Sequence, residues 1–263
     1  MIPPLTFFSL PRAFENKFDY IQYNAIKSWR INFPNSEIIL FGDEKGTHEM
    51  CRKVNAQHYA EIQLNNFGTP FIHSIFGDAQ RLATADTLCY INTDVILLHN
   101  LENITTLAKQ EFKEFLLVAC RWELNLKEKL NFNKDWKAVL QNELSKHSQP
   151  PWPLYSGIDC FIFSKNLFPI ERFPTFLLGR EVWDAWVITD VIHRKIPVIN
   201  ISEEITIIHQ THTRPEDSLD PQQVRTELSH NSKLFYSHYK KQLTIPNVSL
   251  VFQKGKFEKR LPL

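Results

Sequence analysis

Short apolar runs alternate with helical segments along most of this chain, and this alternation restricts the fold more than any other feature. Apolar runs typical of strands occur at residues 5–10, 36–42, 87–91, 115–120, 160–164, 197–201 and 204–212, with a weaker one at 60–64. The segments that we expect to be helical are residues 18–29, 47–54, 71–83, 101–112, 134–147 and 180–194. Strands that are apolar on both faces and separated by helices build a parallel sheet covered on both sides. We therefore predict an α/β fold with a central, mostly parallel sheet.

The composition limits the class of protein. The chain has 263 residues, 43% of them hydrophobic, and we expect residues 1–263 to form a single domain. Its 30 Lys and Arg nearly balance its 29 Asp and Glu, so no overall charge attracts nucleic acid or an anionic membrane. The N-terminus lacks a signal-peptide pattern, and no run approaches the ~20 apolar residues of a membrane span. We expect a soluble, unprocessed protein without a transmembrane anchor.

Two groups of residues bear on where the protein works. The four cysteines are widely spaced and lie mostly in apolar sequence, which favours buried free thiols in a reducing compartment over disulfides. The basic residues near the C-terminus could form a solvated tail, which we favour, or contact a membrane or an acidic partner. They are Lys254, Lys256, Lys259 and Arg260. We predict a cytoplasmic protein and leave open a peripheral association with a membrane.

The apolar run at residues 87–91 ends in Asn92, Thr93 and Asp94 before the chain turns apolar again. A carboxylate beside a hydrophobic core is unfavourable unless something pairs with it. In parallel sheets, ligands bind beyond the carboxyl ends of the strands, and these oxygen-bearing residues lie at such an end. They could bind a hard divalent cation, or they could cap a turn.

Two histidines follow another apolar strand much later in the chain. His209 and His212 come at the end of residues 204–212, where a neutral imidazole could supply a nitrogen ligand. A pair of histidines is more often structural. If the sheet brings them to Asp94, the three residues form one site.

The helix expected at residues 180–194 is apolar nearly all round, so its carboxylates Asp184 and Asp190 lie in low-dielectric surroundings. Such a carboxylate has a raised pKa and can act as a general base. It could instead be bonded to a nearby indole N–H or to Arg180. We favour that second interpretation for Asp190 and leave both open for Asp184.

A proline-rich segment, residues 149–159, precedes the apolar run at 160–164. Gly157 permits close approach of the backbone to a ligand, and Trp152 and Tyr155 offer flat faces of the kind that stack on sugar rings. A rigid connector that crosses the sheet would have a similar sequence.

The order of these motifs resembles the GT-A fold glycosyltransferases, the nucleotide-diphospho-sugar transferase superfamily. The motifs are PRAF, IQYNAIKSW, EIILFGDEKG, GTPFIHSIF, YINTDVIL, SGIDCFIF, GREVWDAW and HQTH, within residues 5–212. The resemblance implies a GT-A type Rossmann-like sandwich that binds a UDP- or GDP-sugar. Residues 1–100 would bind the donor, residues 101–263 would bind the acceptor and carry the catalytic residues, and Mn²⁺ or Mg²⁺ would bridge the diphosphate.

The same resemblance implies roles for individual residues. Asn92 and Asp94 match the DxD motif of the superfamily, with Asn at the first acidic position, so Asp94 would be the main carboxylate ligand. His209 or His212 would complete the metal site. Asp184 matches the position of the base in inverting members. The expected nucleotide-sugar contacts are Pro11, Arg12, Asp43, Asp78, Arg81, Asn92, Thr93, Asp94, Gly157 and Asp159.

The resemblance therefore predicts a metal-dependent glycosyltransferase that moves a sugar to a hydroxyl acceptor, such as one on a glycan. The main alternative is a catalytically inactive carbohydrate- or nucleotide-binding module of the same fold, and Asn92 is its best support. A sugar-nucleotide pyrophosphorylase would need a Gly-rich loop after the first strand, where this chain has SLPRAFENK. A metal-dependent phosphoesterase would need more clustered Asp and His residues.

Overall fold

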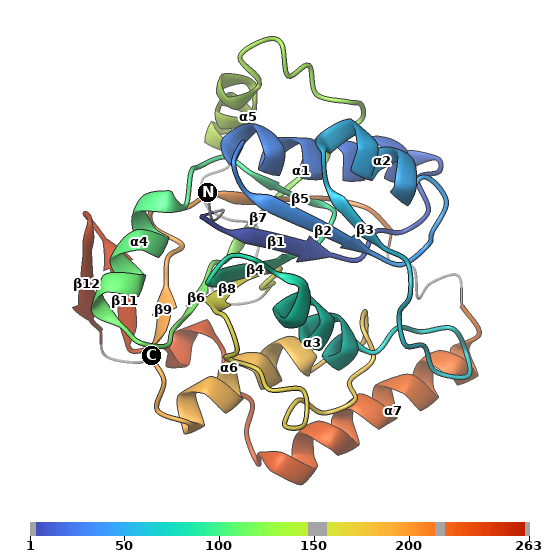
Figure 1. Ribbon diagram of the computed structural model, residues 1–263, viewed down its shortest axis with the longest axis vertical. Coiled ribbons are helices and arrows are strands. Elements are labelled where there is room, and N and C mark those ends of the chain that lie inside the picture. Colours follow the sequence, from blue (N-terminus) through green and yellow to red (C-terminus); the bar gives the residue numbers. More distant parts are fainter. Residues whose placement is uncertain (1–3, 147–156, 214–218, 261–263) are drawn as a thin grey trace.

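The computed structural model describes residues 4–146, 157–213 and 219–260 (Figure 1). Within these residues, nine strands form one sheet. Their order is β12 (Lys256–Lys259), β11 (Leu250–Gln253), β9 (Val198–Asn200), β6 (Leu116–Val118), β8 (Cys160–Ser164), β4 (Thr87–Ile91), β1 (Thr6–Ser9), β2 (Glu37–Phe41) and β3 (Gln57–Tyr59). β3, β2, β1 and β4 pair in parallel, as do β6, β9 and β11, whereas β8 runs antiparallel between β4 and β6. The predicted α/β fold with a mostly parallel sheet is confirmed.

Helices cover both faces of this sheet because successive side chains of each strand point to opposite faces. The helices on one face are α1 (Lys17–Asn32), α2 (Thr47–Val54) and α4 (Glu102–Glu111), and those on the other are α3 (Ile72–Leu82), α6 (Trp183–His193) and α7 (Pro221–His238) (Figure 1). In β1, Phe7 stacks on Trp29 of α1, with ring centroids 5.9 Å apart. The next residue, Phe8, meets Phe76 of α3 at 5.1 Å on the opposite face.

In the described part of the chain, a second sheet joins β5 (Val95–Leu97), β10 (Ile207–Gln210) and β7 (Arg121–Leu124). β10 runs antiparallel to β5 and parallel to β7. Helix α5 (Trp136–Ser145) packs on this sheet, since Trp136 shares an apolar cluster with Ile96 and Ile208. Only residues 92–94 separate β5 from β4, so the small sheet begins at the carboxyl end of a central strand.

Several elements differ from those predicted. The strand expected at residues 60–64 lies earlier, as β3, a partly exposed edge strand whose sequence QHY has no apolar run. Beyond residue 212, where we predicted no element, the chain forms α7, a short 3₁₀ helix (Ile245–Asn247) and the hairpin β11–β12. The hairpin extends the sheet, so the basic residues near the C-terminus are solvent-exposed, as predicted, but they lie on a hairpin rather than in an unstructured tail.

Two further observations concern predictions from composition. All four cysteines are buried, and none is in a disulfide. Among the residues that the structure describes, no helix is both long enough and apolar enough to span a bilayer.

Candidate functional site

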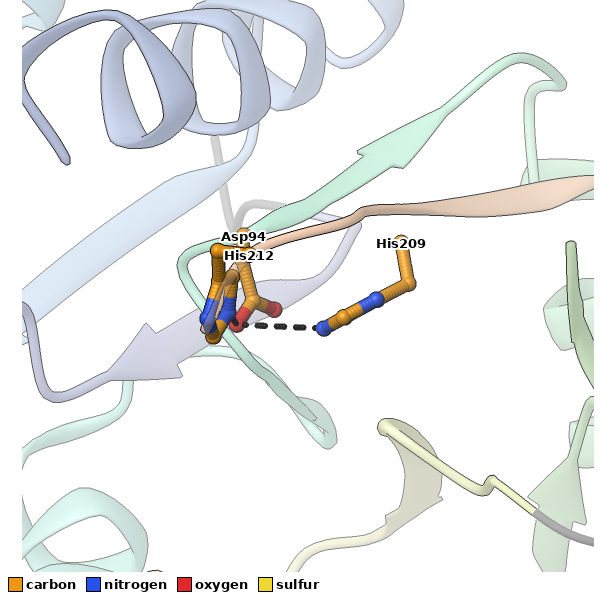
Figure 2. Close-up of side chains that lie close together, drawn as sticks. All are labelled: Asp94, His209 and His212. Atoms are coloured by element: carbon orange, nitrogen blue, oxygen red, sulfur yellow. Dashed lines mark hydrogen bonds and ion pairs between the residues drawn. The ribbon is translucent and has the colours of Figure 1, made fainter. Parts of the chain in front are cut away.

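Asp94 lies in the turn between β4 and β5, and its carboxylate faces two imidazoles (Figure 2). Its Oδ2 atom lies 3.0 Å from Nε2 of His212 and 3.5 Å from Nε2 of His209. Its Oδ1 atom is buried and has no hydrogen-bond partner among the described residues. Among the described residues, the Asp94 side chain therefore contacts imidazoles rather than backbone N–H groups. This disfavours the interpretation that Asp94 caps a turn.

The small sheet explains why the histidines reach Asp94 from so far along the chain. In β10, His209 lies opposite Val95 of β5 on one side and Glu123 of β7 on the other. The backbone N–H of Gln210 donates to the carbonyl of Asp94 at 3.0 Å, and its side-chain amide donates to the same oxygen at 3.1 Å. The turn after β4 is thereby fixed against the end of β10.

The three residues have the chemistry of a cation site. One ligand atom from each of Asp94, His209 and His212 lies within 4.8 Å of the others. A carboxylate oxygen and two imidazole nitrogens suit a divalent transition metal. The unpartnered Oδ1 of Asp94 adds an acceptor that a cation would satisfy. The residues present therefore fit the metal that the sequence resemblance implies.

Without a cation, contacts within the cluster shift the pKa values of Asp94 and His209. Burial alone would raise the pKa of Asp94, but hydrogen bonds from His209 and His212 hold that pKa well below its usual range. Burial alone would lower the pKa of His209, but hydrogen bonds to Asp94 and Glu123 raise it to about 10. A cation would take the place of a proton in this cluster.

Asn92 does not point its amide at the histidines. The amide nitrogen Nδ2 donates to Oδ1 of Asp159 at 2.9 Å, and Oδ1 of Asn92 accepts from the Tyr90 hydroxyl at 2.8 Å. The backbone N–H of Asn92 also donates to the carbonyl of Asp159, at 3.1 Å. An amide can donate to a carboxylate, and an ionised Asp at this position could not. The departure from the acidic pattern therefore has a structural role, which is to hold Asp159.

A chain of charged contacts links Asp159 to the imidazoles. Arg121 on β7 pairs with Asp159 through Nη1 and donates from Nε to Glu123 at 2.8 Å. Glu123 contacts Nδ1 of His209 at 2.7 Å. Gly157 lies against the guanidinium, and a Cβ atom placed there would be 2.8 Å from Nε of Arg121. The backbone at Gly157 therefore lies close to Arg121, and its predicted approach to a ligand stays a prediction.

Asp184 lies in the first turn of α6 and accepts a hydrogen bond from the backbone N–H of Ala185 at 2.8 Å. Burial raises the pKa of Asp184, and the nearby charge of Asp159 adds to the increase. Asp190, in contrast, is held by Arg194 at 3.1 Å and by the Tyr239 hydroxyl at 2.9 Å. The structural interpretation of Asp190 holds, although its expected partners, an indole or Arg180, are wrong.

The other expected nucleotide contacts divide into two groups. Pro11 and Arg12 follow β1, and Gln22 joins them to the site because its Oε1 accepts from the Arg12 backbone at 2.7 Å and from the Thr93 hydroxyl at 2.9 Å. The remaining three make other contacts. Asp43 is exposed and 3.9 Å from His58, whereas Asp78 pairs with Arg81 at 2.7 Å and Arg81 donates to the Tyr59 hydroxyl. Trp152 and Tyr155 lie outside the described residues.

The site also contains four residues that we did not predict from the sequence: Arg121, Glu123, Gln22 and Gln210. Arg121 and Glu123 alternate in the sequence RWEL, as side chains on one face of a strand do. This alternation is the feature of the sequence from which the two residues could have been predicted to lie together. Gln22 and Gln210 are buried amides, and nothing in their local sequence marks them.

Neither a protein-family model nor a curated protein matches the chain. Several solved structures match the chain. PcManGT, a mannosyltransferase from Pyrobaculum calidifontis in complex with GDP-Man and Mn²⁺, matches with a TM-score of 0.47 and 13% identity over 92% of this chain and 66% of that chain. Residues 1–349 of TarS from S. aureus, in complex with UDP-GlcNAc, match with a TM-score of 0.49 and 12% identity. This match covers 89% of this chain and 72% of that chain. A third match is a protein of Desulfovibrio desulfuricans G20 that is assigned to the nucleotide-diphospho-sugar transferases. It has a TM-score of 0.48 and 9% identity, and the match covers 90% of this chain and 98% of that chain. Similarity at this level assigns no activity, and the α/β fold stands on the strand order itself.

Proposed function

We propose that this chain is a metal-dependent glycosyltransferase that moves a sugar from a UDP- or GDP-sugar to a hydroxyl acceptor, for example on a glycan. The observation that carries the proposal is the cluster of Asp94, His209 and His212 with an unpartnered carboxylate oxygen. It lies beyond the carboxyl end of β4, where sheets of this kind bind ligands.

Asp94 and one or both histidines would hold the cation. Mg²⁺ usually takes oxygen ligands, so two imidazoles beside one carboxylate favour Mn²⁺ of the two expected ions. A nucleotide diphosphate is a poor leaving group, and a bound cation neutralises the charge that develops on it. Fe²⁺ and Zn²⁺ accept the same ligand types and belong in any metal titration.

The protein's own residues would bind the donor and move a proton. Residues 1–100 would contact the donor through Pro11, Arg12 and Thr93 near the cluster, and also through Asp43, Asp78 and Arg81. If the reaction inverts the anomeric centre, the carboxylate of Asp184 would accept the proton of the attacking hydroxyl. Retaining chemistry would need no such base. We further propose that the protein acts in the cytoplasm.

The competing proposal is an inactive carbohydrate- or nucleotide-binding module of the same fold. Asn92 favours it because an amide stands where the superfamily pattern has an acid. Transfer or hydrolysis of a nucleotide sugar that requires added Mn²⁺ would exclude this alternative.

Thermal unfolding with a panel of UDP- and GDP-sugars, with and without MnCl₂, tests the proposal. A ligand that binds only the folded state at 100 times its Kd adds about 2.7 kcal/mol of stability. We expect one nucleotide class to raise Tm only when Mn²⁺ is present. The Asp94→Asn variant should lose the effect, and the exposed control Asp86→Asn should keep it. A shift of equal size in Asp94→Asn would contradict the proposed site.

A further inference from the structure

The two imidazoles of the cluster present the same nitrogen to Asp94. Nε2 of His209 and Nε2 of His212 both face Oδ2 of Asp94. On the other side of each ring, Nδ1 meets an acceptor. For His212 this acceptor is the backbone carbonyl of Thr213 at 2.9 Å, and for His209 it is a carboxylate oxygen of Glu123 at 2.7 Å. An acceptor at Nδ1 requires a proton there, so in the neutral ring the lone pair is on Nε2.

Glu123 is held in place by its own neighbours. Its Oε1 accepts from Nε of Arg121 at 2.8 Å, while its Oε2 contacts His209 and accepts from the Thr211 hydroxyl at 3.3 Å. The side chains of Glu123 and His209 are 14% and 13% exposed. The β7–β10 register places the two residues directly opposite each other. A partly buried carboxylate that is held at both oxygens therefore sets the orientation of the imidazole.

We propose that Glu123 is a positioning residue that holds His209 with Nε2 toward a bound cation, an inference that rests on the proposed metal site. Metal-binding histidines commonly donate their other N–H to a carboxylate, which fixes the ring and raises its basicity as a ligand. Through Arg121, the same carboxylate is joined to Asp159. Glu123 thus couples the metal cluster to the loop at residues 157–159.

The Glu123→Gln variant tests this role, because it keeps the shape of the side chain and removes its charge. A Gln amide can donate to Nδ1, which allows the tautomer with the proton on Nε2. Losing the negative charge of Glu123 also removes an attraction to the doubly charged cation. We expect the affinity for Mn²⁺ to fall by about 10- to 100-fold.

The measurement is titration of the full chain with MnCl₂ alone, with free Mn²⁺ followed by electron paramagnetic resonance. Glu143→Gln is the matched control, since Glu143 is also paired, with Lys146 at 2.6 Å, but lies exposed on α5. Its affinity should equal that of the wild type. Thermal unfolding without metal shows whether each variant is folded, and Glu123→Asp, which shortens the carboxylate, replaces Glu123→Gln if that variant does not fold.

The possible outcomes separate this inference from the proposed function. Affinity of the Glu123 variant within twofold of the wild type overturns the positioning role and leaves the proposed function intact. A wild type that binds no Mn²⁺ overturns both the positioning role and the metal site. Weakened Mn²⁺ binding in a protein that transfers no sugar supports the positioning role and contradicts the transferase.

Discussion

The main structural evidence for a bound cation is one carboxylate oxygen at the end of β4, Oδ1 of Asp94. Leaving a buried acceptor without a hydrogen bond costs about 1–3 kcal/mol, and Oδ1 of Asp94 is such an acceptor among the described residues. Its neighbour Oδ2 already faces two imidazoles. A cation bound between these groups would satisfy the oxygen and account for its position.

Some of these residues could be predicted from the sequence and others could not. Asp94, His209 and His212 each follow an apolar run, and the ends of strands are where such sites form. The role of Asn92 could not be predicted, because its partner Asp159 lies on another strand end and their contact depends on the sheet. Glu123 was missed for the same reason, since its partner His209 is 86 residues away.

The Asp184→Asn variant tests the proposed base. We expect turnover to fall by about 100- to 10,000-fold while affinity for the donor survives, since general-base removal has effects of this size. Because the pKa of Asp184 is raised, wild-type turnover should fall as the pH drops through that pKa, and the variant should lack this dependence. Steady-state kinetics and donor binding measure both effects.

Asp190→Asn is the matched control on the same helix. Its carboxylate is occupied by Arg194 and Tyr239, so the change should lower Tm and spare turnover per folded molecule. Unchanged turnover in Asp184→Asn would remove that residue from the mechanism and favour retaining chemistry.

The element that builds the site is the small sheet. β10 joins residues that are far apart in sequence, because it pairs with β5 directly after Asp94 and with β7 at Glu123. β5 and β7 have three and four residues, too few for a periodic pattern to identify them. Helices such as α1 and α3 could be predicted because the spacing of their apolar residues repeats over several turns.

The contact between Gly157 and β7 can be tested by comparing two glycines. Gly157 has φ of +88° and Gly179 has φ of +74°, so Ala at either position is strained by roughly 1–2 kcal/mol. Of these two positions, Gly157 is the one where the new Cβ would meet another group, the Arg121 guanidinium. We expect Gly157→Ala to lose more free energy of unfolding than Gly179→Ala, measured by urea denaturation, and to weaken Mn²⁺ binding as Arg121 shifts. Equal losses in the two variants would mean that the contact is unimportant.

At the scale of the whole molecule, the order of apolar strands and helices was enough to predict the mostly parallel sheet. It did not predict the C-terminal part, because α7 is largely polar and two of its three buried residues, Glu227 and Asn231, are polar as well. Glu227 pairs with Arg180 at 2.6 Å. Such contacts depend on residues from separate segments, so local sequence patterns do not reveal them.

The central claim is that Asp94 reaches the diphosphate of a nucleotide sugar through a cation. The most direct test is a crystal grown with MnCl₂ and UDP or GDP, with Mn²⁺ located by its anomalous scattering. We expect a peak bonded to Asp94, to Nε2 of at least one of His209 and His212, and to the diphosphate. A peak elsewhere, or a nucleotide bound with Asp94 still contacting only the imidazoles, would contradict it.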